Sequence, residues 1–123
     1  MTEDSLIQYC IESAMKTPYQ KGRYRHYCVI TNKKGVIVAE AQNSYEKTNP
    51  IMFYTSQKLG IENKLFGHAE QLAISRVRTK ERNLKLTVVR INKNGKLVNS
   101  KPCPICEYLI TQNKQIKKVE YSN

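Results

Sequence analysis

The sequence predicts a single α/β domain in which helices pack on a mixed β-sheet. Two apolar segments that flank a turn signal near the N-terminus indicate a β-hairpin, and therefore an antiparallel strand pair. Helical and strand patterns then alternate, and strands joined through helices pair in parallel. With 123 residues, of which 40% are apolar, the chain supports one hydrophobic core, so residues 1–123 are expected to form one domain.

The first elements are a helix and the hairpin. Apolar residues recur at helical spacing from Asp4 to Lys16, and Pro18 ends this pattern. Strands are expected over His26–Thr31 and Val36–Ala41, because both are rich in β-branched residues and the turn signal Asn32-Lys33-Lys34-Gly35 separates them.

The segment from Asn43 to Gly67 shows no clean period, so it is predicted to be a long loop with a helical turn around Tyr54–Leu59. A loop of this length in a small domain is usually functional.

The second half alternates. A helix is predicted over His68–Lys80, a strand over Lys85–Asn92, a turn at Lys93–Lys96, a helix over Pro104–Asn113 and a last strand over Ile116–Tyr121. The predicted order is therefore α-β-β-α-β-α-β.

Bulk properties narrow the class of protein. No apolar run is long enough for a membrane helix, and the N-terminus lacks a secretory signal, so a cytoplasmic protein without membrane contact is expected. Cys10 and Cys28 stand alone in apolar surroundings and are expected in the core. The net charge of +11 attracts polyanions and phosphorylated small molecules alike, which leaves nucleic acid open as a partner.

Three residues form a candidate metal site. Cys103 and Cys106 lie three apart at the start of a predicted helix, which places both sulfurs on one side of its first turn. His68 opens the other predicted helix and supplies a third ligand if the two helix starts meet. Three ligands leave the fourth position of a catalytic zinc open, so one Zn²⁺ per chain is expected.

Glu70 completes a catalytic set. A carboxylate beside a zinc-activated water can take its proton and pass it to a leaving amine. The Cys-x-x-Cys pair alone would also suit a redox centre or half of a structural zinc site. Redox pairs usually follow a first strand, however, and the chain has no second pair to complete four sulfurs.

His68-Ala69-Glu70 followed by Pro102-Cys103-Pro104-Ile105-Cys106 resembles the signature of the cytidine and deoxycytidylate deaminase superfamily. The resemblance extends to the order of the elements. It implies a cytidine-deaminase-like three-layer α-β-α sandwich with a mixed sheet, one strand short at the C-terminus or paired there with a partner. It also implies zinc on His68, Cys103 and Cys106, with Glu70 as the proton shuttle.

The resemblance also suggests substrate contacts. Asn43, after the second strand, is similar to the asparagine that several branches use to hold the sugar, and Ala69 is assigned to substrate binding with it. A histidine as first ligand resembles the deoxycytidylate, tRNA-adenosine and polynucleotide-cytosine branches. Ser100-Lys101, just before the second motif, matches neither the tRNA-adenosine branch nor the polynucleotide-cytosine branch. The sequence therefore does not assign the chain to one branch of the superfamily.

The expected function is zinc-dependent hydrolytic deamination of a cytosine-type base, in a nucleoside or nucleotide, to uracil. The alternative is a polynucleotide-editing deaminase acting on single-stranded DNA or RNA, for which Tyr45, Phe53, Tyr54 and Tyr121 are candidate stacking platforms. The third possibility is a catalytically silent, zinc-stabilised binding module. Such modules usually lack the catalytic acid, whereas this chain has Glu70. A homo-oligomer is expected, because the last strand would leave a sheet edge unpaired.

Overall fold

A computed structural model describes residues 3–19, 24–44, 49–60 and 67–122 of the chain. Its elements, in chain order, are α1 (Glu3–Met15), β1 (Arg25–Thr31), β2 (Ile37–Gln42), α2 (Pro50–Leu59), α3 (Ala69–Ser75), β3 (Leu84–Ile91), β4 (Leu97–Val98), α4 (Pro104–Gln112) and β5 (Ile116–Tyr121). Among these described helices, none is long and apolar enough to cross a membrane.

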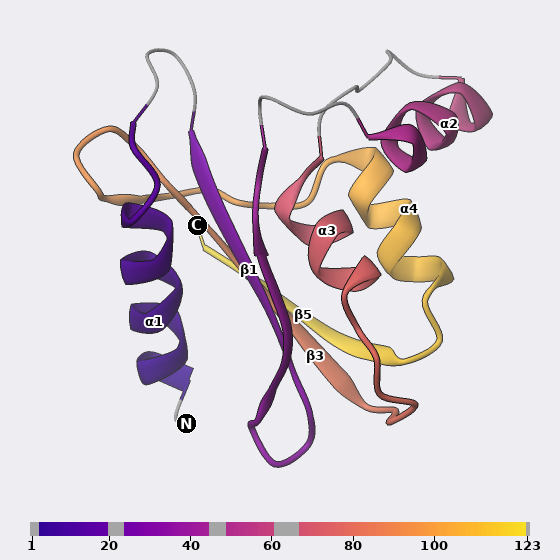
Figure 1. The fold of residues 1–123 in the computed structure, drawn as a ribbon, viewed down its shortest axis with the longest axis horizontal. Coiled ribbons are helices and arrows are strands. Elements are labelled where there is room, and N and C mark those ends of the chain that lie inside the picture. The colour runs from indigo at the N-terminus through magenta and orange to yellow at the C-terminus, as the bar shows by residue number, and fades with distance from the viewer. Residues whose placement is uncertain (1–2, 20–23, 45–48, 61–66, 123) are drawn as a thin grey trace.

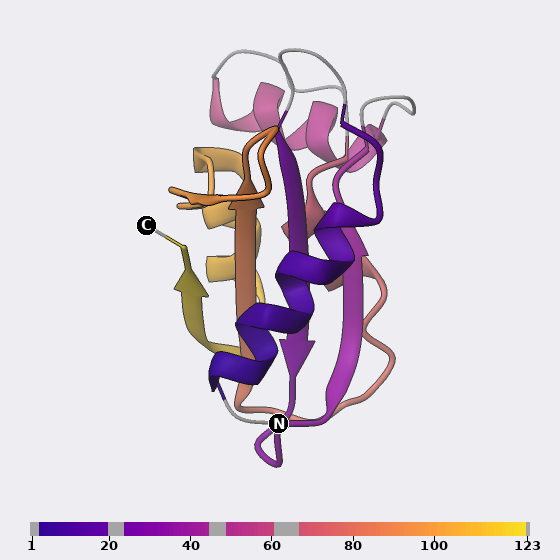
Figure 2. The ribbon, with the colours of Figure 1, turned by 90° about the vertical axis from the view of Figure 1, so that its left-hand side faces the viewer.

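The elements form three layers. Helix α1 covers one face of the sheet, and α3 and α4 cover the other, with α2 beyond them (Figure 1). Figure 2 shows α1 lying across the strands on its own face. The predicted three-layer α-β-α sandwich is therefore confirmed.

The sheet is mixed, as predicted. Strand β1 pairs antiparallel with both β2 and β3. The other edge of β3 is shared, because β5 pairs with it in parallel along Leu84–Val88 and β4 pairs with it antiparallel at Arg90 and Ile91. In the part of the chain that the structure describes, β5 pairs with β3 alone and so forms an edge of the sheet.

The two faces of the sheet bury alternate residues, as the two-residue period of a strand requires. On the α1 face, Leu6 and Cys10 pack against Val29 and Val89. The opposite face holds the larger cluster, which consists of Cys28, Ile30, Ala39, Ala41, Ala69, Ala73, Leu84, Leu86, Val88, Ile110 and Ile116. Both isolated cysteines are fully buried, as predicted.

The prediction of a long loop with one helical turn was wrong in part. Residues 50–59 form a complete helix, α2, inside that segment. The Oδ1 atom of Asn49 accepts hydrogen bonds from the N–H groups of Ile51 and Met52, and Pro50 occupies the first helical position. Gly60 ends the helix with a φ of 67°, which glycine adopts without strain. The start and stop signals were therefore present in the sequence.

Helix α3 ends at Ser75, five residues before the predicted end at Lys80. Continuing the helix would place like charges four residues apart, at Arg76 with Lys80 and at Arg78 with Arg82, which destabilises a helix. The backbone finds other partners, because the side-chain amide of Gln115 donates to the carbonyls of residues 79 and 81.

The two-residue strand β4 was not predicted. It follows the predicted turn, in which the N–H of Gly95 donates to the carbonyl of Asn92 and the Asn92 side chain accepts from two further backbone N–H groups. This hairpin ends the pairing of β3 and directs the chain toward α4. The loop that carries Cys103 follows β4 and therefore begins beside Arg90, near the end of β3.

Candidate metal centre

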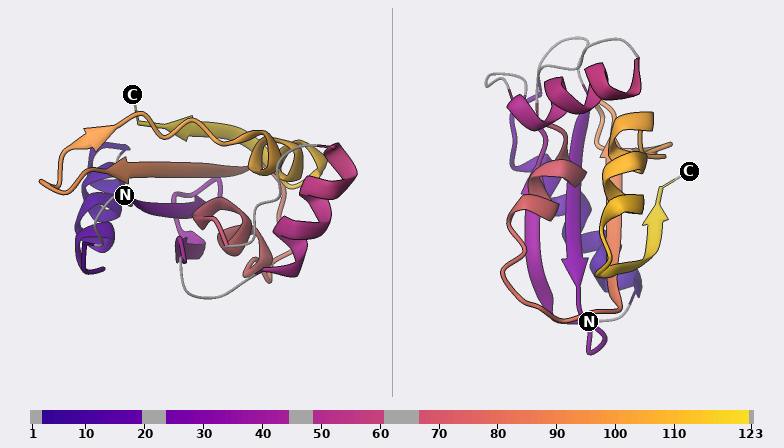
Figure 3. Two further views of the ribbon diagram at one scale, coloured as in Figure 1. Left: turned by 90° about the horizontal axis from the view of Figure 1, so that it is seen from above. Right: turned by 90° about the vertical axis from the view of Figure 1, so that its right-hand side faces the viewer.

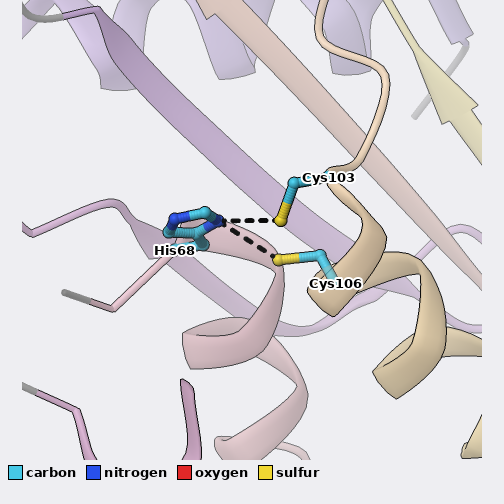
Figure 4. A group of neighbouring side chains, drawn as sticks. All are labelled: His68, Cys103 and Cys106. Atoms are coloured by element: carbon cyan, nitrogen blue, oxygen red, sulfur yellow. Dashed lines mark hydrogen bonds between the residues drawn. The ribbon is translucent and has the colours of Figure 1, made fainter. Parts of the chain in front are cut away.

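The two predicted motifs meet at one end of the sheet, where α3 and α4 begin. His68 and Cys103 are the N-cap residues of these helices, and both have extended backbone conformations. Neither side chain caps its own helix by a hydrogen bond. Both side chains instead point toward each other, together with that of Cys106 (Figure 4).

The spacing of the three ligand atoms fits a zinc ion. His68 Nδ1 lies 3.4 Å from Cys103 Sγ and 3.4 Å from Cys106 Sγ. All three ligand atoms lie within 4.8 Å of one another. Tetrahedral zinc, with bonds of about 2.0 Å to nitrogen and about 2.3 Å to sulfur, requires a nitrogen–sulfur separation of roughly 3.6 Å. The donor set also leaves one tetrahedral position open, so the residues fit a catalytic zinc.

The two sulfurs lie within hydrogen-bonding reach of each other. A hydrogen bond from Cys106, with a further one from His68, lowers the pKa of Cys103 to about 4. The same contact, together with burial, raises the pKa of Cys106. A dication between the sulfurs can take the place of the hydrogen bond between the two thiols, because zinc binds cysteine as thiolate.

Glu70 lies beside the cluster in the first turn of α3. Only 4% of the residue is exposed, and burial raises the pKa of its carboxyl group. The Glu70 N–H, the charge of His68 and a hydrogen bond with Cys106 act in the opposite direction. A buried carboxyl group with a raised pKa, next to a metal position, suits repeated uptake and release of protons.

Helix α2 packs against the start of α4, which carries Cys106. Met52 of α2 is fully buried and packs against Ile105 and Cys106 of α4, with Cys103 and Leu109 at the rim of the cluster. Figure 3 shows α2 beside the start of α4. The segment predicted to be a functional loop therefore contributes to the packing of the second metal motif.

The two predicted substrate contacts lie nearby in different settings. Asn43, after β2, accepts a hydrogen bond at Oδ1 from the N–H of His26 and donates one from Nδ2 to the carbonyl of Tyr24. The side chain of Ala69 is fully buried in the core, which leaves only its backbone available to a ligand.

Sequence reasoning missed three residues beside the centre. His26 shares the site face of β1 with Cys28, and it lies within electrostatic range of His68 and Cys103. Burial, and secondly Arg90, lowers the pKa of His26 to about 4, so its imidazole is neutral at pH 7. Arg90 pairs with His26 across β1 and β3 and stacks on Tyr24. The two-residue alternation along β1 could have placed His26 on this face.

The candidate stacking aromatics are exposed where the structure describes them. Phe53 and Tyr54 lie on α2, exposed by 37% and 68%, and Tyr121 of β5 is exposed by 39%. Tyr45 lies outside the described residues.

Comparisons with known proteins agree with this geometry. The sequence model of the family described as the cytidine and deoxycytidylate deaminase zinc-binding region matches residues 1–123. The fold is similar to the crystal structure of a mutant cytidine deaminase from Mycobacterium tuberculosis, with a TM-score of 0.55 and 14% sequence identity over 96% of this chain and 84% of that chain. No curated protein matches the sequence. The prediction of one zinc ion is confirmed by the family match together with the His-Cys-Cys cluster.

Proposed function

Because the chain belongs to the cytidine and deoxycytidylate deaminase zinc-binding family, we propose that it hydrolyses the exocyclic amine of a cytosine-type base in a nucleoside or nucleotide. The observation that carries this proposal is the position of a buried carboxyl group, Glu70, beside a three-ligand zinc cluster. A redox pair or a purely structural zinc site has no need of that carboxyl group.

Each residue has a separate part in the reaction. His68, Cys103 and Cys106 would hold zinc, which supplies Lewis-acid activation of a water molecule when bound. Glu70 moves both protons of the attacking water, one to the ring nitrogen beside the amine-bearing carbon and one to the departing amine. The carbon–oxygen bond forms, the carbon–nitrogen bond breaks, and ammonia leaves with the base converted to uracil.

Two residues are assigned to substrate positioning. Asn43 uses one N–H of its amide on the Tyr24 carbonyl, and the other remains for a sugar hydroxyl. Ala69 is the first residue of α3, where backbone N–H groups have no partner within the helix, so its N–H is assigned to a carbonyl of the base. Holding the sugar and the base from two elements orients the ring toward Glu70.

A polynucleotide substrate is the second candidate. The exposed aromatic rings of Phe53 and Tyr54 on α2, on a chain of net charge +11, suit stacking of single-stranded bases and attraction to phosphate. The reaction is the same for this candidate, and only the substrate differs, because the base is part of a single strand and not of a free nucleoside or nucleotide.

A product assay tests the proposal. Zinc-loaded protein is incubated with cytidine, deoxycytidine, deoxycytidylate and a cytosine-containing single strand, and uracil-type products are separated by chromatography. Turnover of a nucleoside or nucleotide is expected. Turnover of the single strand alone favours the second candidate, and no product from any substrate contradicts both and points to a silent binding module.

A further inference from the structure

Arg90 places a positive charge on the site face of the sheet. It lies near the end of β3, in register with His26 of β1. Leu86 and Val88, two and four residues earlier on β3, belong to the core cluster under α3, so the alternation of the strand directs Arg90 to the same face. The cation therefore lies at the end of the sheet where the metal centre is built.

The guanidinium group of Arg90 is held in place by contacts that leave it partly open. Its central carbon lies 3.7 Å from the centroid of the Tyr24 ring, and its Nη1 donates to the carbonyl of Asn99 at 3.2 Å. Among the described residues, neither an acceptor for Nη2 nor a carboxylate partner is present. A stacked arginine without a counter-charge is suited to bind an anion.

Arg90 and the metal ligands both lie close enough to His26 to act on its charge. The charge of Arg90 acts on the imidazole of His26, which in turn lies within range of His68 and Cys103. Arg90 thus lies in register with a residue that is close to the metal ligands. In a nucleotide, the phosphate and the amine-bearing carbon of the base lie at opposite ends, which matches a cation set beside the centre and not in it.

We propose that Arg90 binds a phosphate group of the substrate, so that the substrate class is a phosphorylated cytosine nucleoside, either a free 5′-nucleotide or a residue in a single strand. This inference rests on the proposed deaminase function. It makes Arg90 a specificity-determining residue, with Tyr24 and the Asn99 carbonyl fixing the plane of its guanidinium group.

A purely structural role for Arg90 predicts a different result. If it served only to hold the loop before Cys103, its loss would weaken reaction with every substrate equally. Arg25 of β1 offers a matched control, because it also stacks on a tyrosine (Tyr19) and donates to backbone carbonyls. Arg25 lies one position from His26 along β1 and so points to the opposite face of the sheet.

The first experiment compares kcat/KM for deoxycytidylate and deoxycytidine in Arg90→Met, Arg90→Lys and Arg25→Met. Loss of a charged hydrogen bond predicts that Arg90→Met lowers the deoxycytidylate-to-deoxycytidine ratio by roughly 10- to 100-fold. Arg90→Lys should retain part of the preference, and Arg25→Met should leave the ratio unchanged. A ratio unaffected by Arg90→Met overturns the inference.

A binding experiment separates this inference from the proposed reaction. Calorimetry on zinc-loaded Glu70→Gln protein, with and without Arg90→Met, measures the affinity for deoxycytidylate, deoxycytidine and a cytosine-containing oligonucleotide. Weaker binding of deoxycytidylate alone identifies a free nucleotide, and weaker binding of the oligonucleotide alone identifies a phosphodiester. Either result supports Arg90 as a phosphate ligand even if no substrate is deaminated, whereas equal affinities in both proteins contradict it.

Discussion

The N–H of Ser122 donates a hydrogen bond to Ser100 Oγ at 2.7 Å, and the N–H of Ser100 donates to the carbonyl of Ser122 at 2.7 Å. Ser100 Oγ in turn donates to the carbonyl of Val88 at 2.9 Å. The buried pair therefore joins the end of β5 and the segment before Cys103 to β3. This contact fixes the start of the second metal motif.

Replacing Ser100 should destabilise the fold. Ser100→Ala leaves the Ser122 N–H and the Val88 carbonyl with one partner fewer in a buried setting, which predicts a loss of about 1–3 kcal/mol in the free energy of unfolding. Urea unfolding measures it. Ser75→Ala, which removes an exposed hydroxyl at the end of α3, is the control and should cost less than about 0.5 kcal/mol. Equal losses in the two variants would contradict this account.

Zinc removal should change which thiols react. Cys10 and Cys28 are buried in the core, whereas Cys103 and Cys106 belong to the metal cluster. With zinc bound, none of the four thiols is expected to react quickly with a thiol reagent at pH 8. A chelator should expose the two cluster thiols, and denaturant all four. Mass spectrometry of the labelled peptides identifies them, and early labelling of Cys10 or Cys28 would show that the core assignment is wrong.

Alkaline pH should weaken the fold through Cys10. Burial raises the pKa of its thiol from 9.0 to about 12. Between these values the unfolded chain has released the proton that the folded chain retains, so stability falls as pH rises. The stability from this group is complete below pH 9 and declines toward pH 12, by up to about 1.4 kcal/mol per pH unit.

Urea unfolding of wild type and Cys10→Ala from pH 8 to pH 11 measures this effect. The variant should show a shallower decline, although Tyr27 and Cys28, whose pKa values are also raised, keep some slope in both proteins. Parallel declines would mean that Cys10 does not contribute.

The sequence was sufficient to predict most of the fold and the metal cluster. Local spacing placed Cys103 and Cys106 on one helical turn, and the resemblance to the deaminase signature added His68 as the third ligand. The layer order followed from the alternation of helices and strands.

Other features depended on contacts between distant residues. Helix α3 stops at Ser75, before a segment whose like charges disfavour a helix, and Gln115, forty residues later, supplies partners for two carbonyls of that segment. The position of Arg90 beside His26 depends on the register of β1 with β3, which no local pattern determines. Helix α2 was different, since Asn49-Pro50 and Gly60 mark its two ends in the sequence itself.

Assembly is expected to involve more than one copy of the chain. Strand β5 pairs with β3 alone among the described residues, and α2 exposes Ile51, Phe53 and Tyr54. Pairing or covering such surfaces favours a homodimer or larger homo-oligomer, against the repulsion of two chains of charge +11. Light scattering at moderate and at high salt measures the mass, and 14.3 kDa at both would contradict this prediction.

The most direct test of the deaminase centre compares Glu70→Gln with wild type on the substrate that is turned over fastest. Because Glu70 is assigned to protons and not to the metal, the variant should keep one zinc per chain and its fold while turnover falls by at least about 100-fold. Glu107→Gln, at an exposed carboxylate in the first turn of α4, should keep wild-type turnover. Turnover near the wild-type level in zinc-loaded Glu70→Gln would show that another group moves the protons and would contradict the account.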